Sequence, residues 1–241
     1  MNHRHTHSAR AMAESIVHAN SYRQSHQEAR LTPDSPALTI ALSRQVGAGG
    51  TSIATEVGNR LVWPVYDHAL LERIAQEMHL RMQLLESVDE RQTHWLTECV
   101  EGFSREPSIN TNAYVRHLIQ IILSLGAHGS CLIVGRGSPY ILPPATTLRV
   151  RIVADREHRI LGLSRERGIS RSDADAQLDA IDRERIAFIK EHFLKDPRDP
   201  QNFDAVLNSS CFSYADCADL IIEALHSLEE RVRAGEAVCR T

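Results

Sequence analysis

The sequence predicts an α/β fold in which helices cover both faces of a parallel sheet. From about residue 38, short apolar runs alternate with segments that have the 3.6-residue period of amphipathic helices. One run, CLIVG at 131–135, is continuously apolar, as is typical of a strand buried on both faces. Strands and helices that alternate in this way form parallel sheets.

Five strands and the intervening helices can be assigned in order along the chain. We expect strands at 38–43, 63–67, 131–135, 148–154 and 204–210. We expect helices at 51–61, 69–78, 82–103, 113–129, 155–168, 170–193 and 214–232. Ligands of such sheets bind at the carboxyl ends of the strands, so the candidate site should lie along that edge.

Composition and charge exclude several classes of function. The net charge is −4 and the pI about 6.3, so no strong field attracts nucleic acid or an anionic membrane. No apolar run approaches the roughly 18–20 residues that cross a bilayer. The N-terminus has no apolar core of a secretory signal. The five cysteines include no C-x-x-C, which argues against a disulfide framework or a zinc site. We therefore expect a cytoplasmic protein with reduced thiols.

The ends of the chain differ from the middle. Residues 1–36 are rich in His, Arg, Ser and Gln, and we interpret them as a polar, flexible extension. Their histidines at positions 3, 5 and 7 could bind a metal, but no Cys or carboxylate is clustered beside them, so an unstructured tail is the preferred interpretation. Residues 233–241 form a short C-terminal tail.

A glycine-rich loop, SRQVGAGGTS at 43–52, connects the first strand to the first helix. Gly47, Gly49 and Gly50 allow the backbone amides to form an anion-binding concavity at a helix N-terminus. In the frame of the nucleotide-binding motif G-x-x-x-x-G-K-[ST], Arg44 replaces the first glycine and Gly50 replaces the lysine. Thr51 then stands where a hydroxyl binds Mg²⁺. The loop alone fits a phosphate cradle and a simple tight turn equally well.

Two further groups lie at predicted strand ends. Arg136, in the GRG sequence after the strand at 131–135, could bind phosphate through its guanidinium, although an arginine in a loop salt bridge is the alternative. Asp67 follows the second strand, and Arg73 lies in the next helix. They could orient an acceptor and bind its phosphate, while Asp67 could also serve as a helix N-cap.

An arginine-rich pair of helices follows the fourth strand. Its charged residues are Arg156, Arg159, Arg165, Arg167, Asp182, Arg183, Arg185 and Lys190. Arginines on a mobile helical pair can close over a triphosphate and stabilise the charge of phosphoryl transfer. The alternative is a solvated hairpin rich in salt bridges, which the charge pattern by itself favours.

Four segments, in this order, resemble the bacterial cytidylate kinase-like family of the P-loop nucleoside monophosphate kinases. They are ALTIALSRQVGAGGTSIATEVGNRL, GSCLIVGRGSPYILP, IDRERIAFIKEHF and NFDAVLNSS. The resemblance covers roughly residues 38–228. It implies a three-layer α/β/α P-loop NTPase fold with a five-stranded parallel sheet. It also implies a kinase domain at 37–232, with an NMP-binding insertion at about 68–128 and a helical lid at about 165–192.

The resemblance implies an ATP- and Mg²⁺-dependent kinase whose acceptor is CMP or dCMP. It assigns the ATP loop to Gly47, Ala48, Gly49, Gly50, Thr51 and Ser52, with Thr51 as the Mg²⁺ ligand. Acceptor candidates are Asp67, Arg73 and Arg136. The catalytic candidates in the lid are Asp182, Arg183 and Arg185. Small-molecule nucleotides are the expected partners, without nucleic acid or membrane.

Two positions depart from the kinase pattern. Gly50 replaces the lysine of the phosphate loop, and Gly137 replaces the aspartate of a Gly-Arg-Asp motif. We hypothesise that Arg44 or a lid arginine supplies the missing charge, because phosphoryl transfer depends on positioned cations. The alternatives are a nucleotide-binding or regulatory protein that has lost catalysis, and a kinase for another small acceptor.

Overall fold

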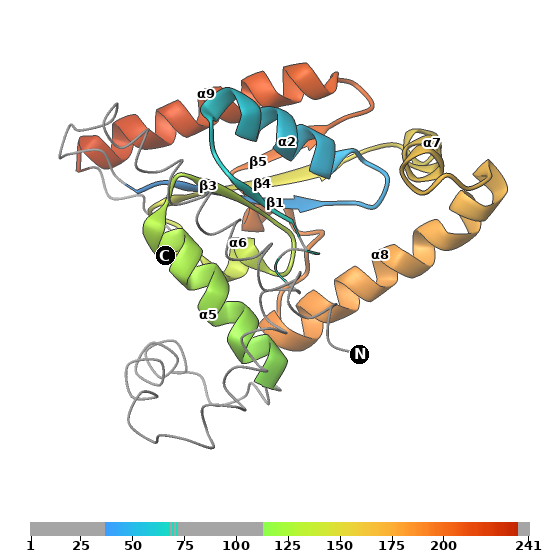
Figure 1. Cartoon of the computed structure of the whole chain (residues 1–241), viewed down its shortest axis with the longest axis horizontal. Coiled ribbons are helices and arrows are strands. Elements are labelled where there is room, and N and C mark those ends of the chain that lie inside the picture. Colours follow the sequence, from blue (N-terminus) through green and yellow to red (C-terminus); the bar gives the residue numbers. More distant parts are fainter. Residues whose placement is uncertain (1–36, 68, 70, 72–112, 236–241) are drawn as a thin grey trace, which may run out of the picture. The chain divides into compact units, whose positions relative to one another are not determined.

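The computed structural model describes residues 37–67, 69, 71 and 113–235 of the 241-residue chain. Five strands form one parallel sheet in the spatial order β2-β3-β1-β4-β5 (Figure 1). They are β1 (Thr39–Arg44), β2 (Val65–Tyr66), β3 (Cys131–Val134), β4 (Thr147–Val153) and β5 (Ala205–Asn208). The predicted α/β class with a five-stranded parallel sheet is confirmed, and β1 lies at its centre.

Helices pack on both faces of this sheet. Those in the described residues are α2 (Gly50–Leu61), α5 (Ala113–His128), α6 (Ser138–Ile141), α7 (Arg156–Arg167), α8 (Arg171–Phe193) and α9 (Tyr214–Arg233), with a 3₁₀ turn, η1, at Pro200–Asn202. Figure 1 shows α2 and α9 on one side of the sheet and α5 and α6 on the other. The three layers follow from two separate apolar clusters.

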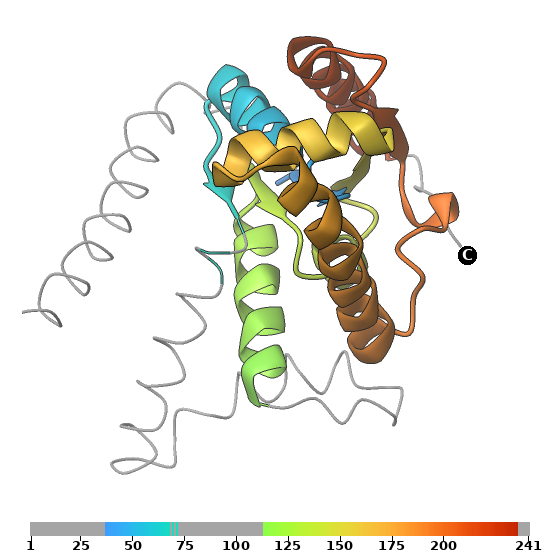
Figure 2. The ribbon, with the colours of Figure 1, turned by 90° about the vertical axis from the view of Figure 1, so that its right-hand side faces the viewer.

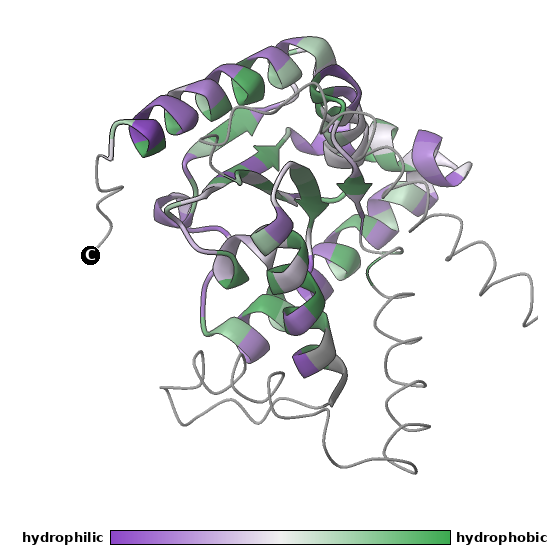
Figure 3. Cartoon of the chain, turned by 60° about the vertical axis from the view of Figure 1, so that its left-hand side comes forward, coloured by the Kyte–Doolittle hydropathy of each residue, from purple (hydrophilic) through white to green (hydrophobic). Residues whose placement is uncertain are grey.

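The alternation of side chains along each strand divides the core. Ile40 and Leu42 of β1 pack with the buried side of α2 and α9, whereas Ala41 between them packs with α5 and α6. This is the two-residue period of a strand with both faces buried. Figure 3 shows the apolar surfaces of the helices turned toward the sheet and the polar surfaces turned outward.

Local sequence accounts for several helix ends. Ser213 caps α9, since its hydroxyl accepts from the N–H of Asp216 (3.1 Å) while the Asp216 carboxylate accepts from the N–H of Ser213 (3.0 Å). Ser170 caps α8 by accepting from the N–H of Asp173 (3.1 Å). Gly168 ends α7 in the left-handed conformation, φ 65°.

The helices α7 and α8 form a hairpin, in which they cross at a large angle, beyond the carboxyl ends of the strands (Figure 2). Its outer side has exposed ion pairs: Arg156 with Asp175 (2.6 Å) and Asp179 (2.8 Å), and Arg171 with Glu157 (2.6 Å). The salt-bridged hairpin that the charge pattern favours is therefore present, and it removes Arg156 from the set of candidate phosphate ligands.

Some sequence expectations differ from the structure. The second strand is shorter than predicted because only Val65 and Tyr66 pair with β3. The short helix α6 was not predicted; Pro139 lies at its beginning, where a missing N–H is tolerated. The predicted helix at 82–103 and the extension at 1–36 lie outside the described residues, as do most of the predicted helix at 69–78 and residues 236–241 of the tail predicted at 233–241. Within the described part, no helix is long and apolar enough to cross a membrane.

Candidate functional site

The glycine-rich loop joins β1 to α2 at the centre of the sheet edge. Gly47 and Gly49 adopt left-handed conformations, with φ 74° and 70°. A side chain on Gly47 would overlap the carbonyl of Arg159 in α7, and one on Gly49 would overlap the ring of Tyr214 in α9. Glycine is therefore required here for both the backbone conformation and the close packing of two neighbouring helices.

The loop presents unused backbone donors at the start of α2. In the described part of the chain, the N–H groups of Gly49, Gly50, Thr51 and Ser52 have no hydrogen-bond acceptor. Thr51 and Ser52 are exposed in the first turn of α2, which has no acidic residue. Four open donors at the positive end of a helix dipole suit a phosphate group. The donor set thus fits the phosphates of ATP, and the Thr51 hydroxyl is free to reach a bound Mg²⁺.

The structure explains why the lysine position of the loop is a glycine. A Cβ on Gly50 would lie 2.6 Å from the Cβ and 2.8 Å from the Cγ of Arg44. The Arg44 side chain continues past Gly50 to the end of β3, where its Nη1 fills the space that a side chain on Gly135 would need. Arg44 thus runs from the phosphate loop to the neighbouring strand end, and two glycines make room for it.

Arg44 lies in a group of positive charges. The pKa of Arg44 is lowered to about 9, chiefly by burial and then by the nearby charges of Arg185 and Arg136. Asp67 at the end of β2 and Glu166 act in the opposite direction. The guanidinium of Arg44 has no hydrogen bond or ion pair within the described residues. A cation held beside two others without a partner favours the entry of an anion.

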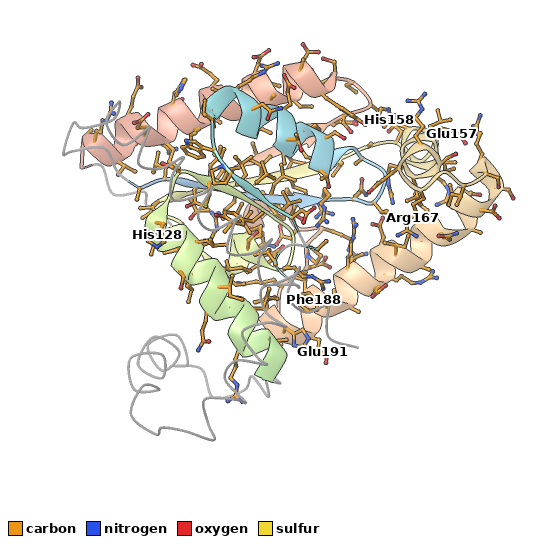
Figure 4. The ribbon with its side chains drawn as sticks, viewed as in Figure 1. His128, Glu157, His158, Arg167, Phe188 and Glu191 are labelled. Carbon is orange, nitrogen blue, oxygen red and sulfur yellow. The ribbon has the colours of Figure 1, made fainter. Side chains whose placement is uncertain are left out.

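Arg44, Arg136 and Arg185 line a cavity of about 540 Å³ between the sheet edge and α8. Its basic lining residues are Arg44, Arg136, Arg151, Arg167, Arg185 and Arg198, and its acidic ones are Asp182, Glu184 and Glu191. Arg167 and Phe188 lie on the side of the hairpin that faces the sheet, with Glu191 farther along α8 (Figure 4). The excess of arginines makes the cavity complementary to phosphate or carboxylate groups.

The hairpin of α7 and α8 contacts the loop directly through Asp182. Its carboxylate accepts a hydrogen bond from the N–H of Val46 (3.1 Å) and forms an ion pair with Arg159. Arg159 of α7 is buried and also donates to the carbonyl of Val46 (3.0 Å). Arg185, one turn after Asp182, approaches the carbonyl of Arg44 (3.5 Å). Asp182 and Arg185 therefore both contact the backbone of the loop.

The GRG segment after β3 has a left-handed backbone at all three residues, Gly135, Arg136 and Gly137. The Arg136 guanidinium lies over the Phe188 ring, 5.4 Å from its centre. A side chain on Gly137 would overlap the ring of Phe193, the last residue of α8. An aspartate at position 137 would therefore meet the ring at the end of α8.

The predicted site residues are thus partly brought together. Arg44, Arg136, Asp182 and Arg185 line the cavity, whereas residues 47–52 of the loop do not, and Asp67 lies close enough to act on the charge of Arg44. Arg183 is exposed and does not line the cavity, whereas Arg167 does. Arg73 lies outside the described residues.

Arg151 and Tyr140 are among the cavity residues that the sequence analysis missed. The strand sequence LRVRIVA has arginines at positions 149 and 151, with apolar residues between and beside them. A charged side chain within a strand that is otherwise apolar was the signal that could have identified Arg151. Tyr140 had none, because the sequence did not predict α6.

A profile of the cytidylate kinase-like family matches residues 39–211. The chain belongs to this family. The match spans the loop, the GRG segment, the lid and β5, and confirms the resemblance inferred from the sequence. A search of curated proteins gave no significant match.

Solved structures are similar to this chain at low sequence identity. A crystal structure of an uncharacterized protein from Eubacterium ventriosum is 19% identical, with a TM-score of 0.63 over 80% of this chain and 99% of that chain. Shikimate kinase from Acinetobacter baumannii in complex with shikimate is 13% identical (TM-score 0.45; 80% and 95% covered). A gluconokinase from Sinorhizobium meliloti is 14% identical (TM-score 0.42; 83% and 97% covered).

Proposed function

We propose that this protein is an ATP-dependent kinase that transfers a phosphoryl group to a nucleoside monophosphate, with CMP or dCMP as the first candidates. Membership of the cytidylate kinase-like family supports the reaction class. The observation that carries the proposal is the course of Arg44, from the lysine position of the loop to the strand end beside Arg136.

The residues of the loop would hold the donor. The amides of Gly49, Gly50, Thr51 and Ser52 bind the phosphates, with Gly47 and Ala48 shaping the turn, and the Thr51 hydroxyl binds Mg²⁺. When bound, Mg²⁺ supplies charge neutralisation for the transferred group. We found no group of three His, Cys, Asp or Glu side chains in the described ranges that could bind a metal alone.

The remaining arginines divide the positioning between them. Arg44 lies between the loop and the residues proposed to bind the acceptor, so its charge stabilises the phosphoryl group during transfer. Arg136, with Asp67 and Arg73, binds the acceptor. Arg185 reaches in from the lid, and Arg167 takes the place that the sequence suggested for Arg183. Asp182 positions the lid through Val46 and Arg159.

A coupled assay of ADP release tests the proposal. The full chain is incubated with ATP, Mg²⁺ and a panel of monophosphates (CMP, dCMP, UMP, AMP, GMP), with small hydroxy acids as a second panel. Turnover with a pyrimidine monophosphate that is lost in Arg44→Ala is the expected result. Turnover with hydroxy acids alone would assign a kinase of another acceptor, and unchanged kinetics in Arg44→Ala would overturn the role of this arginine.

A second candidate is a regulatory protein that binds ATP without turnover, acting in the cytoplasm through small-molecule nucleotides. The contact between Asp182 and the N–H of Val46 favours it, because a lid carboxylate occupies one amide of the loop. Calorimetry separates the two functions. ATP binding with no ADP release for any acceptor would select the regulatory protein.

A further inference from the structure

Arg151 is a buried cation in the wall of the cavity, on the face of the sheet opposite to α2. It belongs to β4 and is only 7% exposed. In the sheet it lies beside Ser43 of β1, and its Nη1 donates to the Ser43 hydroxyl (3.0 Å). Its guanidinium carbon lies 5.5 Å from the centre of the Phe203 ring. These contacts hold the side chain in one place and leave most of its N–H donors unused.

No carboxylate of the described residues forms an ion pair with Arg151. Arg149 on the same strand shows the alternative, because it is bound by Asp204 through its backbone N–H (2.7 Å) and its side chain (3.4 Å). Burial lowers the pKa of Arg151, whereas Asp182 and Asp196 only raise it from a longer range. A buried guanidinium without an ion pair is destabilising, and a bound anion would remove that penalty.

A second unused donor lies nearby. The hydroxyl of Tyr140, in α6, is shielded from water and has no hydrogen-bond partner in the described part of the chain. Burial raises the pKa of Tyr140 to about 12, so the hydroxyl is a neutral donor, and it interacts electrostatically with Arg151. The ring is fixed by Phe193 (6.1 Å between centres) and Phe203 (6.3 Å).

We propose that Arg151, Ser43 and Tyr140 form a second anion-binding subsite in the cavity, which holds a carboxylate or phosphate group of the acceptor. Two unmet hydrogen-bonding needs at one place, both on residues of the cavity wall, point to one missing anion. Ser43 and Arg44 are consecutive in β1 and point to opposite faces, so this subsite is distinct from the arginines beside the loop. The identity of the occupant rests on the proposed kinase function, but anion binding does not.

Titration of the full chain without ATP tests the subsite directly. Inorganic phosphate and malonate serve as probes, with Arg44→Met as the background, because that variant removes the cation beside the loop. Any anion bound by the amides of the loop is common to all variants of the series, so the comparison is of the additional anion. We expect the background variant to bind this additional anion, and we expect Tyr140→Phe added to it to weaken that binding about tenfold, the usual scale for one hydrogen bond to a charged group. Tyr140→Phe keeps the ring packing and removes only an unpaired buried hydroxyl, so the thermal stability should stay equal or rise.

Matched variants exclude a purely structural role. Arg151→Met should abolish anion binding, Arg151→Lys should restore part of it, and Arg149→Met should leave it unchanged, because Arg149 is already paired. The proposal would be overturned if the affinity for each anion were the same in the background variant and in its Tyr140→Phe and Arg151→Met derivatives. A background variant that binds neither phosphate nor malonate would also overturn it. The tighter of the two probes identifies the oxyanion class.

Kinetics separates this subsite from the proposed function. If the wild-type protein turns over, Arg151→Met should raise KM for the acceptor about tenfold and leave KM for ATP unchanged. Equal effects on both constants would contradict an acceptor role. If the wild-type protein has no kinase activity but its anion binding depends on Tyr140 and Arg151, the subsite stands and the proposed function fails.

Discussion

The side chain of Arg44 occupies the space that any side chain on Gly50 would need. A cation reaches the phosphate loop from the end of β1 instead of from the first turn of α2. Arg44 and a lysine at position 50 are therefore mutually exclusive, which makes the departure from the usual motif a paired feature rather than a simple loss.

Gly50→Lys should destabilise the protein, because the new side chain meets the Cβ and Cγ of Arg44. Overpacking of this kind costs about 1–3 kcal/mol. The swap Arg44→Gly with Gly50→Lys removes the overlap and should recover both stability and ATP binding. Urea unfolding and ATP calorimetry on the three proteins check this. If the swap binds no ATP although it is folded, a lysine cannot do the work of Arg44.

Arg44→Met should stabilise the protein without ligand while it abolishes ATP binding. Burial and two neighbouring arginines oppose the charge at position 44, so a neutral side chain of similar length relieves the repulsion. We expect the melting temperature to rise by about 2–4 °C. Differential scanning calorimetry with and without ATP gives both readouts. A lower melting temperature would mean that the arginine is part of the packing and not of an anion site.

Gly137→Asp, which restores the Gly-Arg-Asp pattern, should disrupt the anchor of the lid. The substitution is strained by the φ of 78° and also meets the Phe193 ring. Gly168→Asp is the matched control, since its φ is 65° but no atom lies within 4 Å of the added Cβ. We expect Gly137→Asp to lose about 1–3 kcal/mol more than the control. Equal losses in urea unfolding would show that the ring moves aside freely.

Asp182→Asn should loosen the lid from the loop. The amide can still accept from the N–H of Val46 but leaves the buried Arg159 without its ion pair, at a cost of about 2–4 kcal/mol. Asp179→Asn is the control, because its pair with Arg156 is exposed and contributes about 0–1 kcal/mol. Hydrogen exchange along α8 should accelerate in the first variant alone. Similar protection in both would contradict the latch between lid and loop.

The sequence predicted the architecture well because the signals for it are local. Apolar runs marked the five strands, and the helical period marked α2, α7, α8 and α9 within one or two residues. The glycine loop was placed correctly between β1 and α2. For that loop, a phosphate-binding site and a tight turn remained equal alternatives, because the sequence GAGG at 47–50 does not determine where the backbone amides point.

The site was harder to predict because its decisive contacts join distant positions. Arg159 was a candidate phosphate ligand by its place in an arginine-rich helix, but it is buried against Asp182 and Val46 and supports the loop. Arg183 and Arg185 look equivalent in the sequence, yet the turn of α8 puts Arg185 in the cavity and leaves Arg183 exposed. Helical phase relative to a neighbour is a tertiary property.

The sequence by itself determined the α/β class, the order of the elements and the family, because hydrophobic period, glycine placement and motif order are written along the chain. Only the tertiary structure decided which residues share a space. Arg44 meets Gly50 and Gly135, and Gly137 meets Phe193, because the strand order places β3 and β4 on either side of β1. Because the interior is closely packed, each of these contacts excludes a side chain at the glycine position, and no single segment of the sequence shows this.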